Sequence, residues 1–104
     1  MFSRLRTINV IIVIDGHPSE SCLVAALATA VEAKAAALRD LDIRSRYTGD
    51  VATGTITDSL VVAATNNGQL ISYGGPASEL GQLVGHCVRK AVKEAVTNQG
   101  ECLP

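Results

Sequence analysis

A loop rich in threonine, glycine and aspartate is the part of this sequence best suited to chemistry. Residues 48–59 read TGDVATGTITDS, and Asp58 closes the loop directly before an apolar stretch. A carboxylate there can act as a general base or orient a substrate, or it can cap the next strand through an Asx turn. Long loops in small domains are often functional. We predict Asp58 as a catalytic residue.

The same loop offers hydroxyl groups and glycines. Thr53, Thr55 and Thr57 can donate hydrogen bonds to an amide or a phosphate-like group, although loop threonines often bond to their own backbone. Gly49 and Gly54 serve either the geometry of the loop or the close approach of a ligand. The predicted substrate-binding residues of this loop are Thr53, Gly54, Thr55 and Thr57.

Two further charges interrupt an alanine-rich stretch. Glu32 and Lys34 are two residues apart, a rotation of about 200° on a helix, so they point to opposite faces. A charge on an apolar helix is costly unless it is paired or its pKa shifts. We predict that Glu32 is catalytic and that Lys34 binds substrate. The alternative for Glu32 is a structural salt bridge to Arg44 or Arg46.

Isolated polar residues complete the candidates. Asn9 interrupts an apolar strand, where it either binds ligand or satisfies a loop backbone, and we predict substrate binding. His17 belongs to an Asp-Gly-His-Pro turn, and His86 is expected at the surface or in packing. Cys22 and Cys87 are expected to be small buried residues, because no cysteine or histidine spacing fits a metal site. We therefore expect no metal and no cofactor.

Composition bounds the kind of protein. The chain has 104 residues, 47% hydrophobic and 18% charged, with a net charge of −1 and 3% aromatic residues. These values fit one small domain and argue against a disordered chain. The odd, widely spaced set of Cys22, Cys87 and Cys102 favours buried thiols in a reducing cytoplasm. They also argue against a nucleic-acid partner, which would need a basic surface. No apolar run approaches the ~20 residues of a membrane span, so no membrane partner is expected.

Hydrophobic periodicity and turn residues predict the elements that position these groups. They are a strand at 7–14, a helix from Ser19 or Ser21 to residue 39, a short strand at 43–47, strands at 60–65 and 69–73, and a helix at 77–97. Asn66-Asn67-Gly68 predicts a hairpin. The fold class expected is α+β: two layers, with a mostly antiparallel sheet of three to four strands and two helices packed on one face.

Both helices carry wide apolar surfaces. The first is nearly apolar all round, so more than one of its faces should be covered. The second has a single apolar stripe with charges on the other side. The stripe consists of Leu80, Leu83, Val84, Cys87, Val88, Ala91, Val92 and Ala95.

Four segments in order resemble the adenosylcobinamide amidohydrolases of cobalamin salvage. They are TINVIIVIDG (7–16), TAVEAKAAAL (29–38), RSRYTGDVATGTITDSLVVAA (44–64) and YGGPASELGQLVGHCVRKAVKEAV (73–96). The resemblance covers most of the chain, residues 1–104 as a single domain, and corresponds to the C-terminal half of a family member. Gly75, in the Gly-rich approach to the last helix, becomes a predicted substrate-binding residue by this resemblance.

Two places depart from the family pattern. The family's Gly-Thr-His-Thr-Lys-Leu-Gly run reads Gly75-Pro76-Ala77-Ser78-Glu79-Leu80-Gly81 here, and Ile56 replaces the second glycine of the Gly-Thr-Gly-Thr-Asp loop. The resemblance implies binding of a corrinoid and hydrolysis of its aminopropanol amide to adenosylcobyric acid. The departures favour a non-catalytic alternative. That alternative is a corrinoid- or metabolite-binding module, or a subunit partnering a separate N-terminal half.

The resemblance also bears on assembly. Half of a family member would leave an unpaired sheet edge and an uncovered apolar face if the full-length fold is one continuous sheet. Such surfaces favour self-association, so we predict a homodimer or higher oligomer. A small-molecule-sensing oligomer outside the family is a third hypothesis, by analogy of fold alone.

Overall fold

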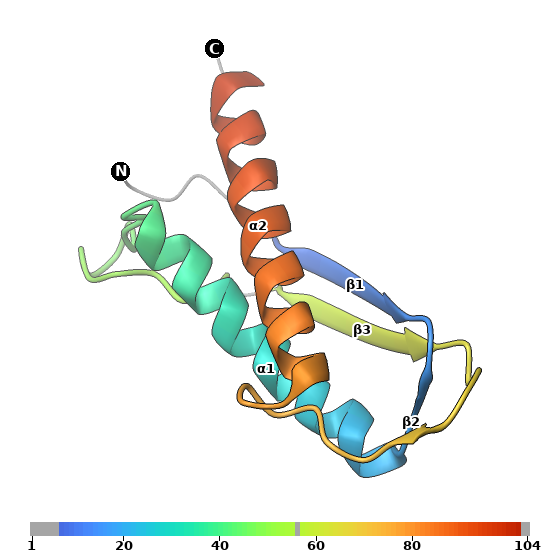
Figure 1. The fold of residues 1–104 in the computed structure, drawn as a ribbon. Coiled ribbons are helices and arrows are strands. Elements are labelled where there is room, and N and C mark those ends of the chain that lie inside the picture. Colours follow the sequence, from blue (N-terminus) through green and yellow to red (C-terminus); the bar gives the residue numbers. More distant parts are fainter. Residues whose placement is uncertain (1–6, 56, 103–104) are drawn as a thin grey trace.

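A computed structural model describes residues 7–55 and 57–102 of this chain. Figure 1 shows α2 crossing α1, with β1 and β3 side by side. The class is α+β, as predicted. The elements are β1 (Asn9–Ile14), β2 (His17–Pro18), α1 (Glu20–Asp40), β3 (Ser59–Ala64), β4 (Leu70–Ile71) and α2 (Glu79–Cys102).

The predicted antiparallel sheet of three to four strands is wrong. The described residues form two sheets of two parallel strands each, with β1 beside β3 and β2 beside β4. β1 and β3 are in register from Asn9 opposite Ser59 to Ile14 opposite Ala64. Parallel strands need a long crossover connection. Here α1 and the loop after it form that connection, so β1–α1–β3 is a single unit.

The predicted hairpin is wrong for a local reason. A type I′ turn needs positive φ at two adjacent residues. Asn66 and Gly68 have φ of 62° and 85°, but Asn67 between them is not in that region. The segment therefore leads away from β3, and β4 pairs with β2 instead. The short strand expected at 43–47 is reduced to one isolated bridge, Arg44 to Val51.

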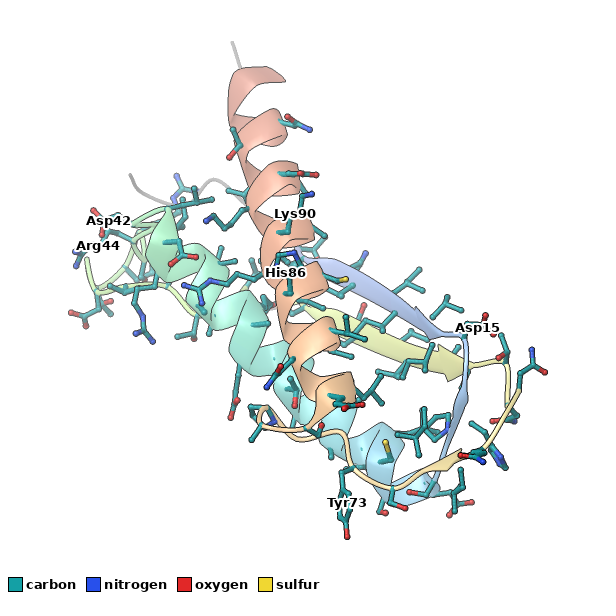
Figure 2. The ribbon with its side chains drawn as sticks, viewed as in Figure 1. Asp15, Asp42, Arg44, Tyr73, His86 and Lys90 are labelled. Atoms are coloured by element: carbon teal, nitrogen blue, oxygen red, sulfur yellow. The ribbon has the colours of Figure 1, made fainter. Side chains whose placement is uncertain are left out.

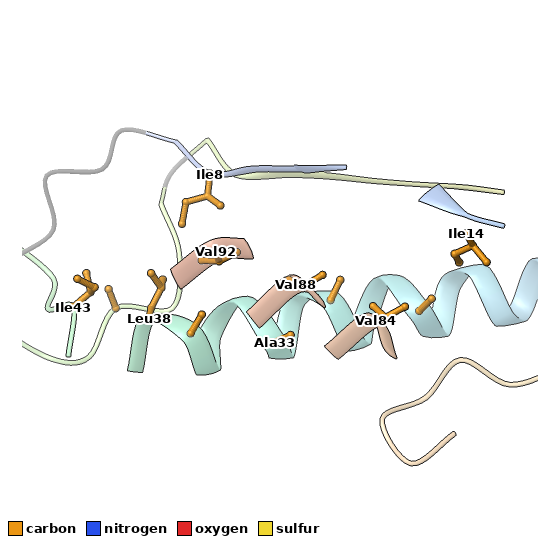
Figure 3. Packing of buried hydrophobic residues seen from close by; sticks show 12 residues of the cluster. Ile8, Ile14, Ala33, Leu38, Ile43, Val84, Val88 and Val92 are labelled. Carbon is orange, nitrogen blue, oxygen red and sulfur yellow. The ribbon is translucent and has the colours of Figure 1, made fainter. Parts of the chain in front are cut away.

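The core lies between the β1–β3 sheet and two helices on the same side of it (Figure 3). Small residues of α1 at helical spacing contact valines of α2, which lets the two helices pack closely. The buried residues at this contact are Ala26, Ala30, Ala33, Ala37, Val84, Val88 and Val92. Alternate residues of β1 and β3 point into this core. The residues between them, such as Ile11, Val13 and Val61, lie on the opposite face of the sheet and are exposed.

The apolar stripe of α2 is only half covered. Val84, Val88 and Val92 are buried, but the side chain of Leu83 is 64% exposed and Cys87 is exposed. The prediction that Cys87 is buried is therefore wrong, because the stripe is wider than the surface that α1 and the sheet cover. Cys22 is buried as predicted, and burial raises the pKa of its thiol.

α1 is long and apolar enough to cross a membrane by length and composition alone. This corrects the statement that no segment approaches that length. Core helices of soluble proteins meet the same criteria, and α1 packs against α2 and β3. Its outward face nevertheless exposes Val24, Leu27, Ala28 and Val31. The sequence predicts that more than one face of α1 is covered, but the described part of the chain leaves this outward face uncovered.

An ion pair joins the end of α1 to α2. Arg89 donates from Nε and Nη2 to the two carboxylate oxygens of Asp40, each at 2.6 Å, and Lys93 Nζ lies 3.4 Å from Oδ2. The hydrogen bonds from Arg89, with the two positive charges, lower the pKa of Asp40 from 3.8 to about 2.

We expect this pair to make stability depend on pH. Because the folded-state pKa of Asp40 is depressed, its contribution is complete above about pH 4 and is lost as the pH falls through about 2. The difference in melting temperature between the wild type and Asp40→Asn should therefore stay constant from pH 7 to about 4.5. It should then shrink towards pH 2, and a difference that is independent of pH would contradict the pairing.

Candidate functional site

Lys34 and Asp58 form a nearly buried ion pair between α1 and the start of β3. Lys34 Nζ lies 2.6 Å from Asp58 Oδ2, and the two side chains are 8% and 11% exposed. The structure thus brings together two of the predicted site residues that are 24 positions apart in sequence. We call this ion pair, with Gly54 and Thr55, the Lys34–Asp58 cluster.

The carboxylate of Asp58 has both oxygens occupied. Oδ1 accepts from the Ile8 amide (3.1 Å) and from the Thr55 hydroxyl, and Oδ2 accepts from the Thr55 amide (3.0 Å) as well as from Lys34. Burial alone would raise the pKa of Asp58, but the hydrogen bonds from Lys34 and Thr55 outweigh it and lower the pKa. A carboxylate in this state is a weak proton acceptor at neutral pH.

Gly54 allows this cluster to close. A Cβ atom at Gly54 would lie 2.9 Å from Lys34 Nζ and would overlap the Asp58 carboxylate. The glycine therefore allows a close approach within the protein, whereas the sequence suggested either the geometry of the loop or the approach of a ligand. Ile56, which departs from the family pattern, lies outside the described residues.

The other predicted residues near this end of the sheet are more exposed. Thr53 and Thr57 are exposed, and the Thr57 carbonyl accepts a hydrogen bond from the Thr7 hydroxyl at 2.8 Å. Asn9 is exposed on the outer face of β1, as the alternation predicts, and its Oδ1 accepts from the Ser59 hydroxyl at 2.7 Å. Asn9 thus pairs across the sheet and does not join the Lys34–Asp58 cluster.

Glu32 lies in a different place, an open groove of about 360 Å³ between α1 and α2. Its polar lining residues are Thr29, Glu32, Gln82, His86 and Arg89, and Pro76 before α2 and Gly81 in the first turn of α2 also line it. We call it the interhelical groove. Figure 2 shows His86 on α2 where the two helices cross. Among the described residues Glu32 has no ion-pair partner, and Arg44 pairs with Asp42 at 2.8 Å instead.

The two predicted catalytic carboxylates therefore do not share one site. Lys34 is buried against Asp58, whereas Glu32 is exposed in the interhelical groove, as expected for residues about 200° apart on a helix. Asp58 and Glu32 cannot act on the same bond within one chain. The Lys34–Asp58 cluster is suited to holding β1, β3 and α1 together, and the groove is suited to receiving a ligand.

Glycines bring the start of α2 to the groove. Gly74 packs against α1 so closely that an added Cβ would lie 2.6 Å from the Cys22 carbonyl oxygen. The Thr29 hydroxyl donates to the Gly74 carbonyl at 2.8 Å, and the Gly75 carbonyl accepts from the amide and the hydroxyl of Ser78. Gly75 thus shapes the turn beside the groove rather than lining the groove itself.

Gln82, His86 and Arg89 were not predicted as site residues. Their spacing of four and three residues places them on one face of α2, and this could have been noticed in the sequence. That this face lies opposite Glu32 depends on how α1 and α2 cross, which the spacing does not contain. Within the described residues, no group of three or more His, Cys, Asp or Glu side chains could hold a metal ion.

A second polar region lies at the carboxyl ends of β1 and β3. The Thr65 hydroxyl donates to Asp15 Oδ1 at 2.9 Å and accepts from the Gly16 amide at 3.1 Å. His17 is half-buried in β2 and pairs with Leu70. These contacts join the two strand ends, so Asp15 and Gly16 act as turn residues, as expected for the Asp-Gly-His-Pro sequence, and His17 acts as a strand residue.

Comparison with known proteins adds an independent line of evidence. A model of the adenosylcobinamide amidohydrolase family matches residues 4–104. An adenosylcobinamide amidohydrolase of Methanosarcina mazei is 33% identical over 108 residues, which cover 95% of this chain and 50% of that protein. An uncharacterized protein of Methanocaldococcus jannaschii is 32% identical over 97 residues, covering 92% of this chain and 38% of that protein.

The chain thus spans half or less of the length of these two curated relatives. No solved structure is significantly similar to it. The residues matched by the family model, 4–104, include all four segments whose sequences resemble this family.

Proposed function

This chain belongs to the adenosylcobinamide amidohydrolase family, and from that premise we propose that it binds a corrinoid and hydrolyses its aminopropanol amide. The products would be adenosylcobyric acid and aminopropanol. The observation that carries the proposal is the interhelical groove, where Glu32 of α1 and the side chains of Gln82 and His86 of α2 line one open space.

The dimensions of the groove suggest how such a ligand would bind. A volume of about 360 Å³ suits the amide side arm of a corrinoid and is too small for the macrocycle. The ring would therefore rest on the exposed rim while the amide reaches between the helices. The cobalt would belong to the substrate.

The side chains of the groove supply the groups that amide hydrolysis needs. Glu32 takes a proton from water as the water oxygen attacks the carbonyl carbon. The side-chain amide N–H of Gln82 and the ring N–H of His86 stabilise the oxyanion. The C–N bond then breaks, and Glu32 returns the proton to the departing amine. Lys34 and Asp58 act behind this site by fixing α1, and thereby Glu32, relative to the sheet.

Replacement of Glu32 tests this assignment. Purified protein incubated with adenosylcobinamide should release adenosylcobyric acid, measured by chromatography with mass detection. Glu32→Gln should lower the rate at least ~10²-fold, the usual effect of losing a general acid–base group. It should leave corrinoid binding, followed by the absorbance of the corrin, within about threefold. Glu94→Gln, an exposed glutamate on α2, is the matched control and should retain full activity.

The outcomes separate the proposed functions. Full activity in Glu32→Gln would remove Glu32 from the mechanism. Binding without product in the wild type would favour the non-catalytic corrinoid-binding alternative, which Pro76 to Glu79 in place of the family's Thr-His-Thr-Lys run already supports. A wild-type protein that neither binds the corrinoid nor forms product would reject both proposed functions.

We also propose that the protein is cytoplasmic.

We further propose that the protein is a homo-oligomer. Support for self-association comes from α1, which carries an exposed apolar stripe at helix-packing spacing, formed by Val24, Leu27, Ala28 and Val31. Light scattering at micromolar concentration should give at least twice the monomer mass. Val24→Glu should reduce it to the monomer mass, and a monomeric wild type would refute the proposal.

A further inference from the structure

β1 has an open edge. Among the described residues β1 pairs only with β3, so one row of its backbone N–H and C=O groups has no strand beside it. The outward side chains of β1 are also uncovered, because Ile11 and Val13 are 74% and 69% exposed. Open, apolar strand edges are normally covered or blocked by charged residues and prolines. Residues 9–14 contain neither.

An apolar groove runs beside this edge. Two cavities of about 330 and 380 Å³ lie between β1 and α2 and share lining residues Val10, Ile11 and Ala91. On the α2 side the groove meets the uncovered half of the apolar stripe, including Leu83 and Cys87. We call these adjoining cavities, with Ile11, Val13, Leu83, Cys87 and Ala91, the edge groove.

The edge groove has the shape that one more β-strand would fill. A strand paired with β1 would lie about 4.8 Å from it, above the exposed side of α2. Its backbone would satisfy the open edge, and its inward side chains would cover Leu83 and Cys87. A helix could bury the same apolar side chains but would leave the backbone edge of β1 unpaired. A strand is therefore the better occupant.

The relatives indicate where such a strand comes from. The match uses 95% of this chain but only 50% of the Methanosarcina relative and 38% of the Methanocaldococcus relative. In these relatives, the unmatched part of the chain is therefore at least as long as the part that matches this protein. We propose that this additional family segment, on the same or a separate polypeptide, adds a β-strand to β1 in the edge groove. The inference does not depend on the proposed hydrolysis.

The experiment co-expresses this chain with the unmatched segment of the Methanosarcina mazei protein, each with its own affinity tag. We expect equimolar co-purification. Leu83→Lys and Ala91→Lys should each weaken the complex at least tenfold, because both residues are exposed on the α2 side of the groove and each substitution places a charge there. Leu70→Lys is the matched control, since Leu70 is 59% exposed in β4 and lies outside the groove, and it should change affinity less than twofold.

Cys87 gives a second readout that does not rely on substitution of groove residues. With Cys102 replaced by serine and Cys22 buried, a maleimide should label Cys87 rapidly in the chain alone and at least tenfold more slowly in the complex. Failure to co-purify, or a complex that Leu83→Lys and Ala91→Lys leave intact, would overturn the proposal. The proposal would also be overturned if Cys87 were protected from the maleimide in the chain alone and became reactive in Leu83→Lys. That result would mean that a second copy of this chain occupies the groove.

Discussion

Asp58→Ala should destabilise this protein more than any other single substitution in the Lys34–Asp58 cluster. It leaves the ammonium of Lys34, which is 8% exposed, without its partner, and it removes the acceptor for the Ile8 and Thr55 amides. Loss of one member of a buried ion pair costs about 3–5 kcal/mol. That is a large part of the 5–15 kcal/mol by which small domains are usually stable, as a rough guide.

The order of the variants is the sharper test. Lys34→Met should cost less, on the order of 1–3 kcal/mol, because the Asp58 carboxylate keeps three donors from Ile8 and Thr55. Asp50→Ala, an exposed loop carboxylate, should cost less than ~0.5 kcal/mol. Urea unfolding at one protein concentration measures all three. A cost for Asp58→Ala no larger than that for Lys34→Met would show that the carboxylate does not organise the cluster.

Local pattern predicted the elements better than it predicted their pairing. The helix cap at Ser19, whose hydroxyl accepts from the Cys22 amide at 3.1 Å, and the strands beginning near Asn9 and Ser59 follow from nearby residues. Pairing of β1 with β3 joins residues 50 positions apart, and its direction depends on where α1 returns the chain. The Asn-Gly pair at 67–68 predicted a hairpin from local sequence alone, and the backbone there does not form that turn.

The candidate site shows the same division. The rotation between Glu32 and Lys34 follows from helix geometry, so their opposite orientations could be predicted. Which of the two is buried could not, because that depends on Asp58 arriving from another element with its Oδ2 2.6 Å from Lys34 Nζ. Grouping Glu32 with Asp58 was reasonable from residue type, but the thickness of α1 separates them.

This separation connects stability with function. A substitution in the Lys34–Asp58 cluster should lower activity only in proportion to the loss of folded protein, whereas Glu32→Gln should lower activity without changing stability. Measuring both properties in each variant therefore distinguishes a residue that positions α1 from one that contacts the substrate.

Gly81→Ala should disturb the groove from the α2 side. An added Cβ would overlap the carbonyl oxygen of Gly75 and lie 3.0 Å from the Ser78 hydroxyl, which caps the Gly81 amide. Because the obstacle is backbone, the start of α2 must move, and such overpacking costs about 1–3 kcal/mol. For a domain of this size each kcal/mol lowers the melting temperature by roughly 4–8 °C.

Gly85→Ala is the matched control, one helical turn further along α2. The nearest atom to an added Cβ there is Thr29 Cγ2 at 4.0 Å, an ordinary contact, so the gain in helix propensity of up to ~1 kcal/mol should prevail. We therefore expect opposite signs: Gly81→Ala melts at a lower temperature than the wild type and Gly85→Ala at an equal or higher one. Both glycines line the interhelical groove, so equal destabilisation by the two substitutions would mean that α2 does not begin against Gly75 as described.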